Sequence, residues 1–197
     1  MTILIPGTNW EASGGWEPAS NGYRGLMACG DALSGEVGTR LLSWLPSRNR
    51  DSDRLAAAET LCAMIAGHSF APRETLNLIT HSHGGNVALA ASHRGLARPI
   101  DTLIALNKPT LRGELYRPGP NIERFYNISA VGDWIQALGS ALLARRSHDP
   151  HAVNHSVDTR SSDLRPHAAL VWDDRIREAW WQWFLRQQSA GESSAIA

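Results

Sequence analysis

The chain has 197 residues, of which 43% are hydrophobic and 19% charged, and its 19 basic and 19 acidic side chains give a formal net charge of zero. This length is typical of one domain, and this apolar content suffices for a buried core, which excludes bulk disorder. A neutral chain without a basic run lacks the electrostatic signature of a nucleic-acid-binding protein, and its apolar stretches are far shorter than the ~20 residues of a membrane span.

Short apolar runs alternate with amphipathic stretches along the chain, which is typical of an α/β protein. In chain order, we expect strands over 2–5, 40–45, 75–80, 100–106 and 125–131. We expect helices over 53–66, 85–95, 135–144 and 173–188. The connections are a loop over 8–38 with about one helical turn, an irregular segment over 107–123 and a polar loop over 147–166. The expected organisation is a single domain over residues 1–188 with a flexible tail over 189–197.

The cysteine content and the start of the chain bear on the compartment. Cys29 and Cys62 are too few for a disulfide framework, although one bridge between them is compatible with the sequence. Residues 1–5 form a short apolar run that meets a Pro-Gly turn at once, whereas a secretory signal has a positively charged start and a longer apolar core. We therefore expect a cytoplasmic protein by default, with export that needs no signal peptide as the alternative.

A candidate nucleophile lies in the segment His81-Ser82-His83-Gly84-Gly85, between the strand expected over 75–80 and the helix expected over 85–95. A tight strand-to-helix turn presents its middle serine at the carboxyl edge of the sheet with Oγ exposed. Small residues are needed two positions before and two positions after the serine, because strand and helix pass close together there. The N–H of His83, at the start of the helix, would point at a developing oxyanion. The alternative is that Ser82 only caps the helix.

This segment resembles the nucleophile turn of the α/β-hydrolase superfamily, in particular that of lipases and esterases. The resemblance covers most of residues 2–187 and departs from the pattern G-x-S-x-G at Thr80, which stands where the first glycine usually lies. It implies an α/β-hydrolase fold: a mostly parallel central sheet flanked by helices, in a minimal version without a large cap domain.

The resemblance also implies that an acid and a histidine follow Ser82 in that order. Asp133 comes just after the strand expected over 125–131, where the superfamily holds the carboxylate that orients the histidine, although it could also cap a following helix. His167 precedes the last helix, where the superfamily places its catalytic base, and His155 is the alternative base.

Other acids and histidines fit these roles less well. Asp101 begins its strand and would lie at the opposite edge, while Asp149 and Asp158 lie in the expected polar loop. His81 and His83 diverge around the turn, so we expect satisfied polar contacts there, not a metal site. The polar loop expected over 147–166 contains a cluster of residue types that can ligate metals: His148, Asp149, His151, His155 and Asp158. We expect this cluster to be solvated and the protein to need no metal.

The loop after the first expected strand resembles the one that completes the oxyanion hole in the superfamily. Gly7 matches the usual His-Gly-x pattern and Pro6 replaces the histidine, which implies Thr8 as the donor by position and Asn9 as the second choice. The alternative is an ordinary turn. A candidate substrate pocket comprises Asn9, Trp10 and Trp134.

These features predict a serine hydrolase that cleaves carboxylic esters, lipids among them, through an acyl-enzyme and without a cofactor. The same residues also support amide or thioester cleavage. Two alternatives are a non-catalytic binding module of the same fold and a secreted antibacterial lipase-type effector. The last helix has an aromatic face that we expect to pack on the sheet, with contact to a membrane surface or a partner as the alternative: Ile176, Trp180, Trp183 and Phe184.

Overall fold

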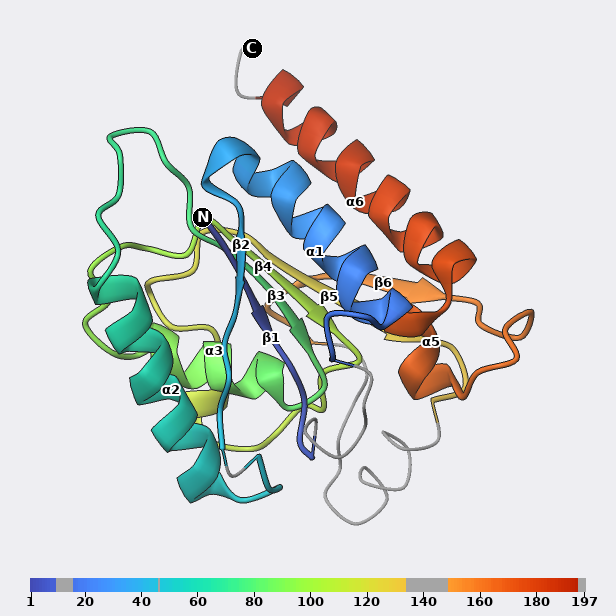
Figure 1. Ribbon diagram of the computed structural model, residues 1–197, viewed down its shortest axis with the longest axis horizontal. Coiled ribbons are helices and arrows are strands. Elements are labelled where there is room, and N and C mark those ends of the chain that lie inside the picture. The colour runs from blue at the N-terminus through green and yellow to red at the C-terminus, as the bar shows by residue number, and fades with distance from the viewer. Residues whose placement is uncertain (10–15, 46, 134–148, 195–197) are drawn as a thin grey trace.

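The computed structural model describes residues 1–9, 16–45, 47–133 and 149–194. Its centre is a six-stranded sheet in the order β2-β1-β3-β4-β5-β6, in which every neighbouring pair is parallel (Figure 1). The strands are β1 (Thr2–Ile5), β2 (Thr39–Leu41), β3 (Asn77–His81), β4 (Thr102–Leu106), β5 (Phe125–Ala130) and β6 (Val153–Val157). Because all strands run the same way, their carboxyl ends meet at one edge of the sheet, where ligand sites of such folds lie.

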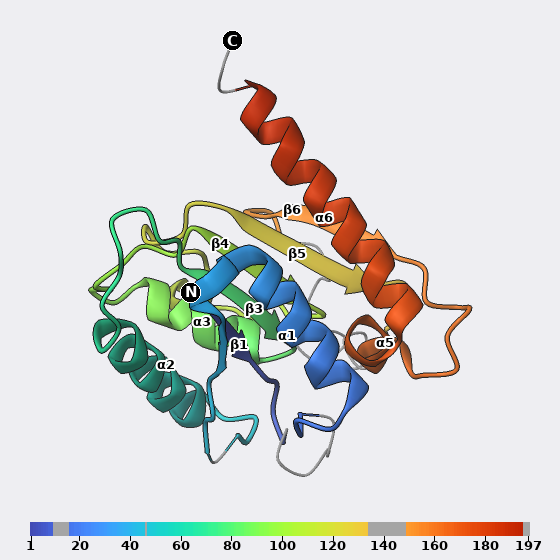
Figure 2. The ribbon, with the colours of Figure 1, turned by 45° about the horizontal axis from the view of Figure 1, so that its top comes forward.

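Helices cover both faces of this sheet (Figures 1 and 2). They are α1 (Asn21–Ser34), α2 (Asp51–Ala66), α3 (Gly84–Ser92), α5 (Pro166–Trp172) and α6 (Asp174–Ser194), with short 3-10 turns η2 (Gly35–Val37) and η3 (Glu114–Tyr116). Successive residues of β1 alternate between the two layers, since Ile3 and Ile5 pack with α2 and α3 whereas Leu4 packs with α1, α5 and α6. The α/β architecture predicted from the sequence is confirmed.

The prediction of a loop over 8–38 is wrong, because that segment contains α1. Ser20 caps the helix by accepting the N–H of Tyr23 at 3.2 Å. Glycines lower the helical propensity of this sequence, but they are the points of closest packing. A Cβ on Gly22 would lie 2.6 Å from Nε1 of Trp172, and one on Gly25 would overlap the guanidinium of Arg177. The glycines that weaken the helical signal thus allow α1 to lie against α5 and α6.

The prediction of a continuous polar loop over 147–166 is also wrong, since β6 lies within it. This edge strand pairs with β5 in the register Ile128↔His155. Its polar residues resemble a loop because an edge strand exposes much of its surface. The helix expected over 135–144 lies outside the described residues. Residues 189–194, assigned to a tail from the sequence, continue α6.

The aromatic face of α6 packs on the sheet as predicted. Trp180 and Phe184 are fully buried and Trp183 meets the ring of Tyr126 edge-on. Trp181, which the helical pattern places off this face, is buried as well because it stacks on Phe184 at 5.3 Å. Among the described helices, none combines the length and apolar character needed to cross a bilayer.

Candidate active site

Ser82 occupies a tight turn between β3 and α3. Its φ of +53° lies in the left-handed region, which is uncommon for residues other than glycine and costs backbone strain. Hydrogen bonds hold it there: its N–H donates to the carbonyl of Leu106 at 2.8 Å, and its carbonyl accepts from Gly85 at 3.1 Å. The expected strand–turn–helix arrangement is therefore present.

Two glycines give this turn the space it needs. A Cβ on Gly84 would lie 2.6 Å from the carbonyl oxygen of Pro6 and closer still to that of Ile5, and a Cβ on Gly7 would lie 2.9 Å from Cβ of Ser82. At the position where the family pattern has its first glycine, Thr80 is fully buried and donates its hydroxyl proton to the carbonyl of Ile104 on β4 at 3.3 Å. The departure at Thr80 is therefore accommodated, because the close approach falls on Gly7 and Gly84 instead.

Asp133 and His167 form a hydrogen-bonded pair, although 34 residues separate them in sequence. Nδ1–H of His167 donates to Oδ2 of Asp133 at 2.7 Å. The carboxylate is nearly buried, with 3% of its side chain exposed, whereas the imidazole is 17% exposed. Asp133 follows the end of β5, and His167 is the second residue of α5, which begins with Pro166. A carboxylate bonded to Nδ1 fixes the tautomer in which Nε2 is the basic nitrogen.

The turn that carries His167 lies against the turn that carries Ser82. Nε2–H of His81 donates to the carbonyl oxygen of His167 at 3.0 Å, and the centroids of these two rings are 4.9 Å apart. Within the described residues, the Ser82 hydroxyl makes no hydrogen bond with His167. Catalytic hydrogen bonds are often long in ligand-free enzymes and shorten when substrate binds. The contact with His81 thus places the turn of His167 at the edge of the sheet where Ser82 lies.

The residues expected to bind an oxyanion come from the loop after β1, whose Gly7 lies against Ser82, and from the start of α3. Thr8 follows Gly7, and its N–H donates to no other residue in the described part of the chain. His83 precedes the first turn of α3, where backbone N–H groups carry the positive end of the helix dipole. Asn9 is exposed and donates its N–H to the carbonyl of Ser47 at 2.8 Å. The other two pocket candidates, Trp10 and Trp134, lie outside the described residues.

His81 is a buried neutral histidine. Burial, with a smaller contribution from nearby His167, lowers its pKa from 6.5 to about 3, although its bond to the His167 carbonyl opposes the shift. Its ring lies edge-on to Trp172 at 5.5 Å and 6.3 Å from Trp16. This is the satisfied polar contact expected from the sequence.

The shifted pKa of His81 makes folding stability depend on pH. From pH 6.5 down to about 3 the unfolded chain binds a proton that the folded chain excludes, so the free energy of unfolding falls as pH falls, by at most about 1.4 kcal/mol per pH unit. The substitution His81→Gln keeps a donor for the His167 carbonyl but removes the titration. We expect urea unfolding between pH 6.5 and about 5, above the ordinary carboxylate pKa values, to show a shallower pH slope in this variant.

The matched control for this pH effect is His155→Gln. His155 is less buried, and its pKa is lowered by desolvation and by Arg186, so we expect a smaller change in slope. A slope that His81→Gln leaves unchanged would contradict the assignment.

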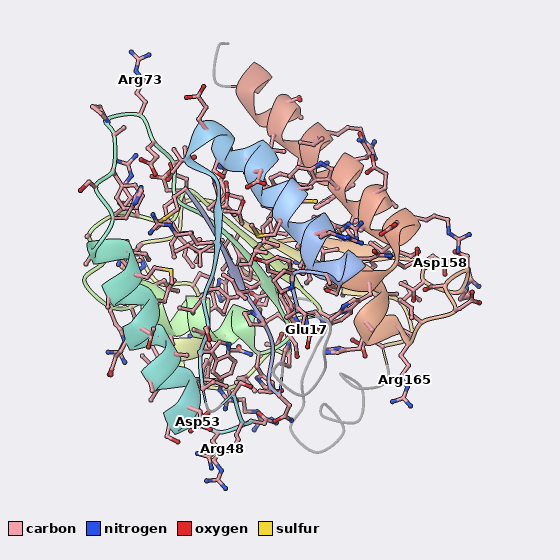
Figure 3. The ribbon with its side chains drawn as sticks, in the orientation of Figure 1. Glu17, Arg48, Asp53, Arg73, Asp158 and Arg165 are labelled. Carbon is pink, nitrogen blue, oxygen red and sulfur yellow. The ribbon has the colours of Figure 1, made fainter. Side chains whose placement is uncertain are left out.

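The competing acids and the competing histidine lie elsewhere. The ring of His155 stacks on Trp183 at 4.2 Å. Asp101 accepts the N–H of Leu76 at 2.7 Å. Asp149 pairs at 3.1 Å with Lys108, the only lysine in the sequence, and both side chains are buried. Asp158 pairs with Arg160 at the periphery of the molecule (Figure 3).

Sequence reasoning missed two residues beside the site, Arg54 and Asn107. Arg54 of α2 is buried, held by Asp51, and its Nη1 lies 3.5 Å from Nδ1 of His83. Asn107 follows β4 directly and donates from its amide to the carbonyl of His167 at 3.0 Å. A polar residue that directly follows a buried strand, as Asn107 does, is the one sequence signal that could have identified it.

Comparisons with known proteins bear on the fold. No protein-family model matches the sequence, and no curated protein matches it at a significant level. Among solved structures, the chain is similar to the ydeN gene product from B. subtilis, with 12% identity and a TM-score of 0.50 over 79% of this chain and 83% of that one. It is also similar to a proposed cell surface hydrolase from Lactobacillus plantarum WCFS1, with 13% identity and a TM-score of 0.50 over 90% of this chain and 95% of that one. At such identities the likeness concerns the fold, and with the parallel sheet it shows that the chain has the α/β-hydrolase fold.

Proposed function

We propose that this protein is a serine hydrolase that cleaves carboxylic esters, with Ser82 as nucleophile, His167 as general base and Asp133 as the acid that orients it. The observation that carries the proposal is the 2.7 Å bond between His167 and Asp133, at the same edge of the sheet as the strained turn of Ser82. The fold is consistent with hydrolysis, since one structural neighbour bears the name of a cell surface hydrolase.

The reaction has two halves. Oγ of Ser82 attacks the ester carbonyl while Nε2 of His167 takes the hydroxyl proton, and the carbonyl π electrons move to oxygen. Asp133 keeps Nδ1 protonated and stabilises the imidazolium that forms. The tetrahedral intermediate then collapses, the C–O bond to the alcohol breaks, and His167 returns its proton to the leaving alkoxide. Water, deprotonated by the same Nε2, then attacks the carbonyl of the acyl-enzyme. The second tetrahedral intermediate collapses, the bond from the acyl carbon to Oγ breaks, and His167 returns its proton to Oγ, which leaves the free acid and free Ser82.

The negative oxygen of each intermediate needs donors, and the N–H groups of Thr8 and His83 are the candidates. They belong to the loop after β1, whose Gly7 lies against Ser82, and to the start of α3. Removing one such donor from a site of this kind typically lowers turnover about 10²–10³-fold. Both donors are backbone N–H groups, so their positions depend on the conformation of the two loops that carry Thr8 and His83.

A fluorophosphonate probe, which reacts with an activated serine hydroxyl, tests the proposal. We expect the wild-type protein to be labelled covalently and Ser82→Ala to remain unlabelled, because the probe's phosphorus takes the place of the ester carbonyl. Mass spectrometry of the intact protein measures the adduct.

The control for this labelling is Ser129→Ala. Ser129 lies near the carboxyl end of β5 with its Oγ 3.3 Å from that of Ser156, so its removal should leave labelling intact. An unlabelled wild type, or labelling that persists in Ser82→Ala, would favour a binding module of the same fold.

A further inference from the structure

Asn107 has an unusual backbone conformation at the end of β4. Its φ is +50° and it is fully buried. Its own N–H donates to the carbonyl of Ile128 at 2.8 Å, which continues the pairing of β4 with β5. Asparagine tolerates the left-handed region better than most residues, so the chain can turn here while keeping a polar side chain inside the protein.

The side-chain amide of Asn107 connects two segments that are distant in sequence. Its Oδ1 accepts the N–H of Ala130 at 2.8 Å, and its Nδ2 donates to the carbonyls of His167 at 3.0 Å and Pro166 at 3.2 Å. Each bond satisfies a backbone group of the partner segment, and the buried amide would be costly without them.

Those two segments carry the candidate acid and base. Ala130 is the last residue of β5, and its carbonyl accepts the N–H of Asp133 at 3.4 Å. The side-chain amide of Asn107 therefore binds the residue from which the turn of Asp133 begins. The carbonyl of His167 belongs to the base itself and accepts a second bond from His81, which precedes Ser82. One side chain therefore spans the acid and base turns, and His81 adds the nucleophile turn to the same carbonyl.

We propose that Asn107 is a positioning residue, which fixes the turn of Asp133 relative to the turn of His167 and thereby sets the direction of Nε2 in the reaction. The inference rests on the proposed function for its catalytic part. Its structural part, the dependence of the Asp133–His167 bond on Asn107, stands on the contacts alone. We refer to the bonds from the Asn107 side chain to Ala130, Pro166 and His167 as the bridge. A displacement of about 1 Å between catalytic groups can lower the rate about 10²-fold, so loss of the bridge should lower kcat measurably.

The substitution Asn107→Asp tests the bridge with little change of shape. A carboxylate tolerates the same φ and can still accept the N–H of Ala130, but it cannot donate to the carbonyls of Pro166 and His167. We expect kcat for p-nitrophenyl butyrate to fall about 10²-fold while KM changes less than about threefold, because positioning acts on the chemical step.

The matched control is Asn121→Asp. Asn121 also donates from one amide to two backbone carbonyls, those of Ser92 and Arg94, both at 2.9 Å. It precedes β5, at the opposite edge of the sheet from the site. The two variants therefore lose the same kind of bonds, and we expect only Asn107→Asp to lose activity.

A second measurement does not require catalysis. The Nδ1–H proton of His167, hydrogen-bonded to Asp133, gives a proton NMR resonance downfield of the amides, identified by its loss in His167→Gln. We expect this resonance to persist in the wild type and in Asn121→Asp, and to shift or vanish in Asn107→Asp. If the wild type hydrolyses no ester, the proposed function fails but the resonance still tests the bridge.

Asn107→Gly covers the case in which the aspartate variant does not fold. Glycine accepts φ of +50° without strain and removes all three side-chain bonds. We expect the resonance to shift or vanish and kcat to fall about 10²-fold, as in Asn107→Asp. An unshifted resonance together with the kcat of Asn121→Asp, in a folded Asn107 variant, overturns the inference.

Discussion

Replacing His167 with alanine is expected to lower kcat for p-nitrophenyl butyrate hydrolysis by about 10⁴-fold or more, the size of effect that follows loss of the base in a Ser-His-Asp site. The expectation depends on the 2.7 Å bond that joins Nδ1 of this imidazole to Asp133. Asp133→Asn should cost about 10⁴-fold as well, because an amide can donate to Nδ1 and so favour the wrong tautomer. Steady-state kinetics at saturating ester provide the measurement.

The matched control for the base is His155→Ala. His155 stacks on Trp183, whereas the imidazole bonded to Asp133 is that of His167, so we expect kcat to change less than about threefold. If His155→Ala abolished hydrolysis while His167→Ala remained active, the base would be assigned wrongly. Comparable losses in both variants would mean that His155 contributes through the packing of β6 against α6.

Gly84→Ala is expected to lower the free energy of unfolding by about 3 kcal/mol and to abolish hydrolysis. The new Cβ would lie 2.6 Å from the carbonyl oxygen of Pro6, and the carbonyl of Ile5 is nearer still. Both are backbone atoms at the end of β1, so they cannot move aside as the end of a flexible side chain could. Alanine would otherwise favour the helix by about 1 kcal/mol, and the overlap therefore decides the sign. Urea unfolding gives the stability change.

Gly95→Ala is the control for this second prediction. A Cβ at Gly95 would meet no atom within 4 Å, so we expect a change of less than about 0.5 kcal/mol and full activity. Equal stabilities for the two alanine variants would show that the turn can shift to admit a side chain, and the account of the small-residue requirement at Gly84 would then be wrong.

The sequence predicts the α/β architecture because β1, β3, β4 and β5, which are buried on both faces, each contain a short apolar stretch between amphipathic segments. It does not predict α1 or β6. In α1, the glycines that permit contact with Trp172 and Arg177 also lower the helical propensity. In β6, the edge position allows a polar composition that resembles a loop. In both cases contacts with residues distant in sequence determine the structure, and the local sequence pattern carries no information about those contacts.

The site follows a similar division. The order of Ser82, Asp133 and His167 in the chain is available from motif and position, and the structure brings the last two into contact. Asn107 was missed, since its importance lies in bonds to segments that begin 23 and 59 residues further along the chain. Thr80 departs from the motif, and the turn tolerates it because the close approaches fall on Gly7 and Gly84, which the motif alone does not reveal.

The candidate acid and the candidate base follow β5 and β6, the last two strands both in the chain and in the order of the sheet. Ser82 follows β3, so the candidate nucleophile and the candidate base reach the same edge of the sheet only after the chain from position 82 to position 167 has closed through successive crossovers. Pairing of parallel strands that are distant in sequence is slow compared with helix formation. In a refolding experiment, recovery of esterase activity should therefore lag behind recovery of the far-ultraviolet circular dichroism. Chains truncated before α5, which lack His167, should never regain esterase activity.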